Sequence, residues 1–209
     1  MSIAIRVKFI RGGEAKYVSH LELIRVFERA VRRAGLPIAY TLGFNPHPRM
    51  VFGLPLAVGV TSEAEYADFE LAEEMRPEDF MDRLNRQLPA GLKIVEAFVR
   101  RGKSNIMADI KGAAYSVVVC AGDMPESVDI RKLTEVFLAR PKIMAEKETK
   151  SGVKEIDIKP MIKKMSVDES FSMGDSEIAG ACGNGKMFRF DIETSAGSEA
   201  NLKPELLFA

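Results

Sequence analysis

Six segments within the first 99 residues have hydrophobic residues that recur with the period of a strand or a helix, and their order is what most constrains the fold. Strand-like segments cover residues 3–10, 49–58, 64–72 and 92–99, and helical segments cover residues 20–34 and 77–88. The order strand, helix, strand, strand, helix, strand is that of the ferredoxin-like fold. We therefore predict an α+β domain in which two helices cover one face of an antiparallel sheet.

The first helix is the best defined element, because both of its ends carry local signals. Ser19 followed by Glu22 forms a capping-box sequence, and Gly35 with Pro37 beyond it marks the end. One side of this helix is apolar and the opposite side is basic. The apolar residues are Ile24, Phe27, Ala30, Val31 and Ala34, and the basic ones are Arg25, Arg29, Arg32 and Arg33.

The second half of the chain gives weaker signals. Residues 100–112 lack any hydrophobic period. We predict a first domain over residues 1–102, a linker over 103–112 and a second, less regular α+β domain over 113–209. Within the second domain we expect strands at residues 113–121, 142–148, 154–160 and 186–193, a helix at 128–139 and a short helical turn near the end.

Composition excludes several classes of protein. The chain is 46% hydrophobic and 29% charged with no net charge, so no global field favours nucleic acid. No apolar run is long enough for a membrane helix and the start lacks a signal-peptide layout, so we expect a cytoplasmic protein that does not bind membranes. Cys120 and Cys182 show no metal-ligand spacing. We expect buried thiols, no metal and no cofactor.

The loop GFNPHPRM, residues 43–50, is the first candidate binding site. Pro46 and Pro48 stiffen the backbone around His47, so little conformational entropy would be lost on binding. The prolines and the glycine also have a sufficient explanation in turn geometry. The side chains that turn geometry leaves unexplained are Phe44, Asn45, His47 and Arg49.

The two histidines are the candidate catalytic residues. His20 lies just inside the first helix, where the helix dipole disfavours its charged form, although most histidines in such positions are simply packed. Whether His20 and His47 meet depends on which segment forms the second strand. Hairpin pairing with residues 64–72 favours residues 49–58 over 38–42, and this choice places the two histidines apart.

Local charge supports RNA binding. Residues 1–50 carry nine basic and three acidic residues, a surplus of about six positive charges, and four of them lie on the first helix. The alternative is a solvated face in which Glu28 pairs with Arg32. The sheet itself is a poor platform for stacked bases, because Arg6 and Lys8 should lie beside Asp68 and Glu70. Helix and loop residues would therefore have to bind the RNA.

The motifs SHL, RRAGLP, GFNPHP and SEAEY within the first 100 residues resemble the radical SAM-linked family, an uncharacterised bacterial domain found alone or fused to cobalamin-binding radical SAM proteins. The genes of that family often neighbour a ribonuclease of the E/G type and ribosomal proteins, so the resemblance implies RNA as a partner. This chain has no radical SAM cysteine triad. The resemblance therefore implies a radical SAM protein as a separate partner chain, and it transfers no catalytic residue.

Three functional hypotheses follow from these features. The first is a non-catalytic RNA-binding or adaptor protein that acts with a radical SAM enzyme through Phe44, Asn45, His47, Arg49 and the four helix arginines. The second is a metal-independent RNA-processing enzyme with His20 or His47 as general acid or base. The third is a protein–protein interaction module, which would expose an apolar patch.

Overall fold

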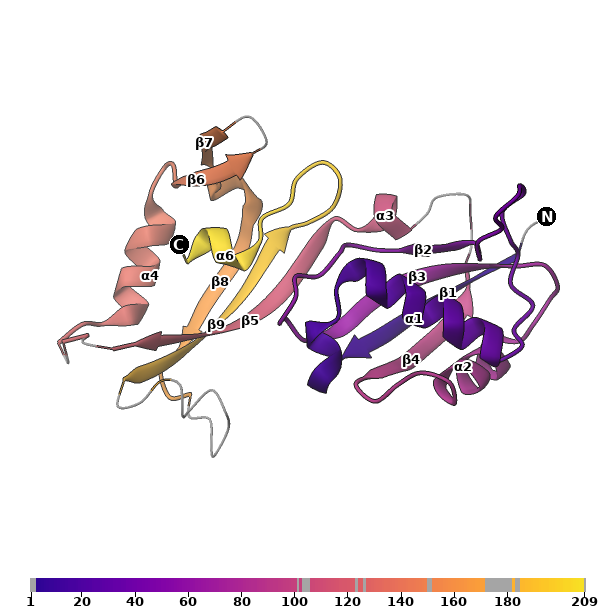
Figure 1. Cartoon of the computed structure of the whole chain (residues 1–209). Helices are drawn as coiled ribbons and strands as arrows, with labels where there is room; N and C mark the ends of the chain where they lie inside the picture. Colours follow the sequence, from indigo (N-terminus) through magenta and orange to yellow (C-terminus); the bar gives the residue numbers. More distant parts are fainter. Residues whose placement is uncertain are drawn as a thin grey trace. The chain divides into compact units, whose positions relative to one another are not determined.

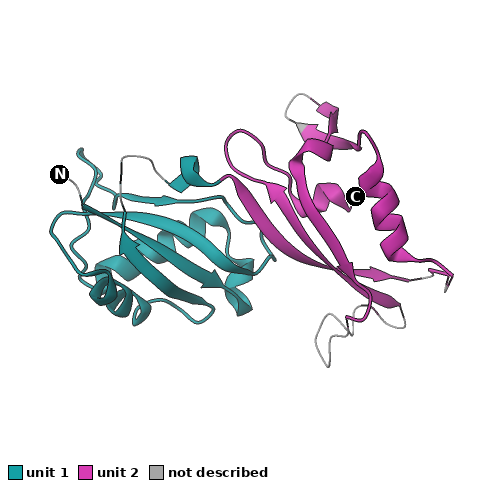
Figure 2. Cartoon of the chain, turned by 180° about the vertical axis from the view of Figure 1, so that it is seen from behind, with its two compact units in different colours: residues 1–110 teal, residues 111–209 magenta. Residues whose placement is uncertain are grey.

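The computed structural model describes residues 3–100, 102, 106–122, 124–125, 127–149, 152–171, 182 and 185–208. The chain forms two compact units, residues 1–110 and residues 111–209, coloured separately in Figure 2. Both units combine antiparallel sheets with helices, so the α+β class is confirmed. No helix among the described residues combines the length and hydropathy needed to cross a membrane.

Unit 1 has the predicted ferredoxin-like topology. Its sheet has the order β2-β3-β1-β4, with every neighbouring pair antiparallel. The strands are β1 (Ile3–Arg11), β2 (Met50–Phe52), β3 (Ser62–Leu71) and β4 (Leu92–Val99). The helices are α1 (His20–Arg33) and α2 (Pro77–Asn85), and a 3-10 turn, η1 (Gly13–Tyr17), precedes α1. Figure 1 shows α1 running across one face of this sheet.

The core of unit 1 lies between the sheet and these two helices. Ile5, Val7 and Phe9 from β1 are fully buried, as the alternating sequence predicts. They pack in one cluster with Phe27 of α1 and Phe80 of α2. The capping box of α1 is confirmed, since the Ser19 hydroxyl accepts from the Glu22 amide and the Glu22 carboxylate accepts from the Ser19 amide.

The opposite face of the sheet carries a buried ion-pair network. Asp68, only 1% exposed, accepts two hydrogen bonds from Arg6 at 2.7 and 2.9 Å and one from Arg100 at 3.4 Å. It also accepts from the backbone N–H of Ile106, the first residue of α3 (Ile106–Asp109). The Asp109 carboxylate closes the network with a 2.7 Å contact to Arg6. The network thus fastens α3 to the outer face of the sheet.

This arrangement partly confirms the expected sheet surface. Arg6 lies directly opposite Asp68, as predicted. Lys8 lies opposite Tyr66 and Glu96, so the prediction that it lies beside Glu70 was wrong. The reason is the register, which places Glu70 opposite Ala4. α3 and paired charges occupy part of this face, which also carries Tyr66 opposite Lys8 and the exposed Phe98 opposite Arg6.

The second strand is much shorter than the predicted span 49–58. Only Met50–Phe52 pairs with β3, and the Gly53 amide adds one further hydrogen bond to Tyr66. Pro55 has no amide to donate, so pairing cannot continue through it. The competing segment 38–42 makes two isolated bridges, Ile38 to Leu71 and Tyr40 to Pro48, and its Ala39 amide donates to Glu70, so it touches β3 without forming a strand. The preference for residues 49–58 as the second strand was therefore correct in location and wrong in length.

Unit 2 contains a three-stranded sheet of order β5-β9-β8 and a separate hairpin of β6 and β7. Its strands are β5 (Gly112–Ala121), β6 (Met144–Thr149), β7 (Gly152–Asp157), β8 (Ile162–Asp168) and β9 (Lys186–Ser195). Its other elements are α4 (Ile130–Ala139), the 3-10 turn η2 (Lys159–Met161) and α6 (Pro204–Leu207). Strand β8 was not predicted from the sequence. Phe188, Phe190 and Ile192 of β9 form the centre of one core cluster.

The boundary between the units falls inside the predicted linker. Of residues 103–112, residues 103–105 lie outside the described part of the chain. Residues 106–109 form α3, which packs on unit 1, and strand β5 already begins at Gly112. Gly53 shows how closely this segment packs, because a side chain there would lie 2.7 Å from the Ile110 side chain.

Candidate functional site

The GFNPHPRM loop is the outer half of an irregular hairpin, which we call the tip hairpin and define as residues 38–49. Its two arms are joined by hydrogen bonds from the Thr41 amide to the His47 carbonyl and from the Arg49 amide to the Ala39 carbonyl. The Thr41 hydroxyl also accepts from the His47 amide at 3.0 Å. The base of the hairpin is tied to β3, since the Ala39 amide donates to Glu70 and the Glu70 amide donates to Arg49. The tip is therefore presented on a hydrogen-bonded stem.

The tip itself is apolar and open. Phe44 is fully exposed, Leu42 is 95% exposed and Tyr40 is 40% exposed. Gly43 between them has φ +129°, a backbone conformation that favours glycine. Asn45 is also exposed. An exposed phenyl ring at the end of a stiff stem lowers solubility and adds nothing to core packing. We therefore infer that this tip contacts a partner.

The tip hairpin is connected to α1 by one side-chain contact. Nδ1 of His47 lies 3.5 Å from the Glu28 carboxylate. Glu28 thus pairs with the hairpin, whereas the alternative of a solvated face had it paired with Arg32. Arg25 and Arg32 stand three residues before and four residues after Glu28, so they lie on the same side of α1 as the hairpin.

Arg25, Arg29 and Arg32 are all exposed, and we call them the arginine face. Within the described part of the chain, no ion pair shorter than 4.0 Å involves any of them. Their guanidinium groups therefore keep their capacity to bind an external anion, for which the planar N–H fork is well suited.

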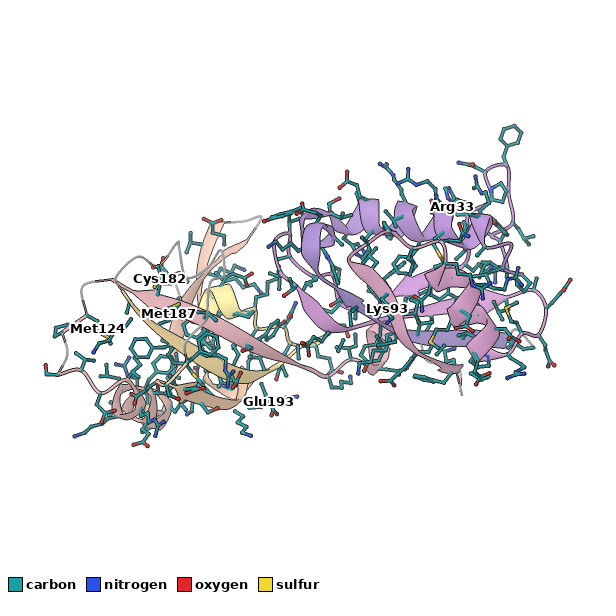
Figure 3. The ribbon with its side chains drawn as sticks, turned by 90° about the horizontal axis from the view of Figure 1, so that it is seen from below. Arg33, Lys93, Met124, Cys182, Met187 and Glu193 are labelled. Atoms are coloured by element: carbon teal, nitrogen blue, oxygen red, sulfur yellow. The ribbon has the colours of Figure 1, made fainter. Side chains whose placement is uncertain are left out.

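The other two predicted arginines already have protein partners. Arg33, at the C-terminal end of α1 (Figure 3), donates to the Gln87 carbonyl at 2.7 Å. Arg49 donates to the Glu70 carboxylate at 3.1 Å. Both side chains are exposed, so these bonds are those of surface groups and compete with water. Arg33 follows the arginine face along α1, and Arg49 is the last residue of the tip hairpin. Their hydrogen bonds within the protein partly fix the positions of both guanidinium groups.

His20 lies in a different environment from His47. Its ring stands edge-on to Phe52 with the centroids 6.1 Å apart, at the N-terminal end of α1. Glu28, the partner of His47, is eight residues further along the same helix, a rise of about 12 Å. The two imidazoles therefore have separate neighbours and do not form a dyad. The geometry that a two-histidine ribonuclease site would need is absent from this pair.

Burial lowers the pKa of His20, and the positive charge of Arg11 lowers it further. The sequence had suggested the helix dipole as the cause. Arg11 is 1% exposed and donates to the backbone carbonyls of Ala15, Lys16 and Val18, so its charge is fixed beside the helix start. His20 is therefore a neutral ring at neutral pH.

The lowered pKa of His20 predicts a pH dependence of folding. His20 of the unfolded chain binds a proton near pH 6.5, whereas the folded chain binds this proton only at a lower pH. The free energy of unfolding therefore decreases as the pH falls below about 6.5. We expect His20→Asn to flatten the fall in unfolding free energy between neutral and mildly acidic pH. Urea titrations followed by circular dichroism at several pH values measure this, with His47→Asn as the matched control. Equal pH profiles for the wild type and His20→Asn would contradict the assignment.

Two features of this site were missed from the sequence. Leu42 and Tyr40 extend the apolar tip beyond Phe44, and Glu28 joins hairpin and helix. The position of Leu42 beside Gly43 could have indicated the first of these, because both residues adjoin the same turn. No sequence signal indicates the Glu28 contact, since it depends on where the hairpin lies over the helix.

Comparisons with known proteins assign the chain to a family but do not indicate an activity. A protein-family model described as "Uncharacterized protein conserved in bacteria (DUF2344)" matches residues 4–204, nearly the whole chain and both compact units. No curated protein matches the chain. The description of that family mentions neither RNA nor radical SAM proteins.

Proposed function

We propose that this chain, which belongs to the uncharacterised family conserved in bacteria that is described above, is a cytoplasmic protein that binds single-stranded RNA between its tip hairpin and its arginine face. The observation that carries the proposal is the fully exposed Phe44 on a stem that contacts α1 at Glu28, between the exposed Arg25 and Arg32. Proteins that bind unpaired strands combine cations for the backbone with aromatic rings for the bases.

Each part of the surface has a chemical role in this proposal. Arg25, Arg29 and Arg32 bind phosphate oxygens, and Phe44 stacks on a base. Asn45 offers an amide to a base edge. His47 donates or accepts through the ring nitrogen that does not face Glu28. Stacking tolerates any base, so we expect affinity with little sequence preference.

The proposal includes an adaptor role. The resemblance to radical SAM-linked proteins suggests that the RNA is presented to a separate radical SAM enzyme, whose chemistry this chain does not supply. The arrangement of the site is compatible with such a role, because its side chains are exposed. A pull-down of the native protein that identifies bound RNA and bound protein together tests this part of the proposal.

The aromatic part of the site gives a direct test. Phe44→Ala is expected to weaken binding of a labelled single-stranded oligoribonucleotide about 5- to 100-fold, because stacking on an aromatic ring contributes about 1–3 kcal/mol per base. Fluorescence anisotropy at low and moderate salt measures the affinity.

Leu42→Ala is the matched control, since Leu42 is as exposed as Phe44 but has no aromatic face. RNA stacking predicts a small effect at Leu42 and a large one at Phe44. Similar losses in both variants would instead indicate an apolar surface that docks on protein. The absence of RNA binding by the wild type at low salt would overturn the proposal.

A further inference from the structure

Two cysteines that are far apart in the sequence meet at one end of the sheet in unit 2. Cys120 is the second-last residue of β5, and Cys182 lies four residues before the start of β9 at Lys186. Both thiols are free, and they hydrogen-bond to one another. Cys120 is exposed and Cys182 is half-buried, so the expectation of two buried thiols was wrong.

The backbone around Cys182 fixes its position. Its sulfur lies 3.6 Å from the Gly185 carbonyl and 4.0 Å from the Lys186 carbonyl, and the Gly185 amide donates back to the Cys182 carbonyl. Gly185 packs closely on the end of β5, because a side chain there would lie 2.9 Å from the Ala121 carbonyl. Cys182 and Gly185 are thus held against the strand that carries Cys120.

A third sulfur faces the same place. Met187 of β9 is directly opposite Cys120 of β5, and both residues alternate with the core residues of their strands, so they share the outer face of the sheet. Cross-strand neighbours have Cβ atoms about 4.5–5.5 Å apart, within reach of a flexible thioether. Figure 3 shows Met187 and Cys182 in this part of unit 2. Met124, also labelled there, packs instead with the core cluster of the inner face.

We propose that Cys120, Cys182 and Met187 form a site for a soft monovalent metal ion, Cu(I), with two thiolate ligands and one thioether ligand. Thiolate and thioether sulfurs are soft ligands that suit Cu(I), zinc and iron–sulfur clusters, and of these Cu(I) accepts the lowest coordination numbers. Zinc needs four ligands, usually with histidine or carboxylate among them. Among the described residues no group of three or more His, Cys, Asp or Glu side chains gathers to hold such an ion.

The binding step involves no redox change. Cu(I) displaces the two thiol protons, so two copper–thiolate bonds and one copper–thioether bond form and two protons pass to solvent. The exposed Cys120 gives the ion a path of entry.

The experiment is an anaerobic titration of the reduced full-length protein with Cu(I) in competition with a chromogenic Cu(I) chelator. We expect one equivalent of Cu(I) to be retained, with a thiolate-to-copper charge-transfer band in the ultraviolet. Cys120→Ser and Cys182→Ser should each lower the affinity by at least about tenfold, since even the loss of an outer-shell partner costs this much at metal sites. Met187→Leu should weaken binding while leaving the band in place.

Met124→Leu is the matched control, because it removes a thioether from the same unit on the other face of the sheet. It should bind Cu(I) like the wild type. Circular dichroism checks that all variants fold. Retention of Cu(I) by Cys120→Ser and Cys182→Ser at wild-type affinity would overturn the site, and equal affinity of Met187→Leu and the wild type would overturn the thioether ligand. Failure of the folded wild type to retain Cu(I), with a Cys120–Cys182 disulfide forming in air, would overturn the metal site in favour of a redox pair.

Discussion

Replacing Arg25, Arg29 and Arg32 together with glutamate is expected to reduce RNA affinity at least 100-fold and to remove most of its salt dependence. Hydrogen bonds to charged groups contribute about 1.5–3 kcal/mol each, so the loss of three should lower the RNA affinity by more than about 100-fold. For single strands the slope of log affinity against log salt changes by about −0.7 per phosphate contact, so the slope should become shallower by about two. None of the three side chains is buried, so the fold should persist.

The matched control changes the net charge by the same amount in unit 2, outside the residues proposed to bind RNA. Lys142, Lys147 and Lys154 are exposed lysines of unit 2, and their replacement by glutamate should leave the affinity near that of the wild type at physiological salt. Exposed charges that do not touch the RNA are largely screened at physiological salt. If the control weakens binding as much as the α1 variant, only net charge matters and the proposed site is wrong.

The second large effect is on stability and concerns Asp68. Asp68→Asn is expected to destabilise unit 1 by about 3 kcal/mol or more, because the largely buried guanidinium groups of Arg6 and Arg100 both lose the Asp68 carboxylate and only Arg6 also contacts Asp109. The hydrogen bonds of Asp68 and Asp109 raise the pKa of Arg6, so this cation cannot relieve the loss by releasing its proton. The loss should also release α3 from the sheet, since Asp68 caps its first amide.

Hydrogen-exchange mass spectrometry measures this change, because it reports the amides of unit 1 separately from those of unit 2. Faster exchange is expected in β1, β3 and α3. Glu96→Gln is the matched control on the same sheet face, since the Lys8–Glu96 pair is exposed and should contribute no more than about 1 kcal/mol. Equal protection of β1 and β3 in the two variants would show that the network is no stronger than a surface ion pair.

The parts of the fold that depend on residues close together in the sequence could be predicted from the sequence. The α1 capping box, the end signal at Gly35 and the alternation of β1 are interactions within a few residues of one another, and all three are confirmed. The order of six elements then left few ways to bury their apolar faces, which is why the ferredoxin-like topology of unit 1 was predicted correctly.

Predictions failed where a long-range contact decided the outcome. Strand β2 ends at Phe52, well short of the predicted residue 58, because Pro55 cannot pair with β3 and the following loop is held elsewhere by the bond from Gly59 to Lys16. Strand β8 was missed because its sequence is mostly polar, and it is a strand only because β9 pairs with it.

The sequence by itself determined which residues are available for function: an arginine-rich helix face, a stiff loop with Phe44 and His47, and two cysteines without a metal spacing. The tertiary structure alone decided which of them act together. It placed Glu28 against His47, kept His20 apart from His47, and brought Cys182 to Cys120 and Met187. The physical reason is that helix caps and strand alternation are encoded within a few residues, whereas these contacts depend on the register of strands and the packing of loops across the whole chain.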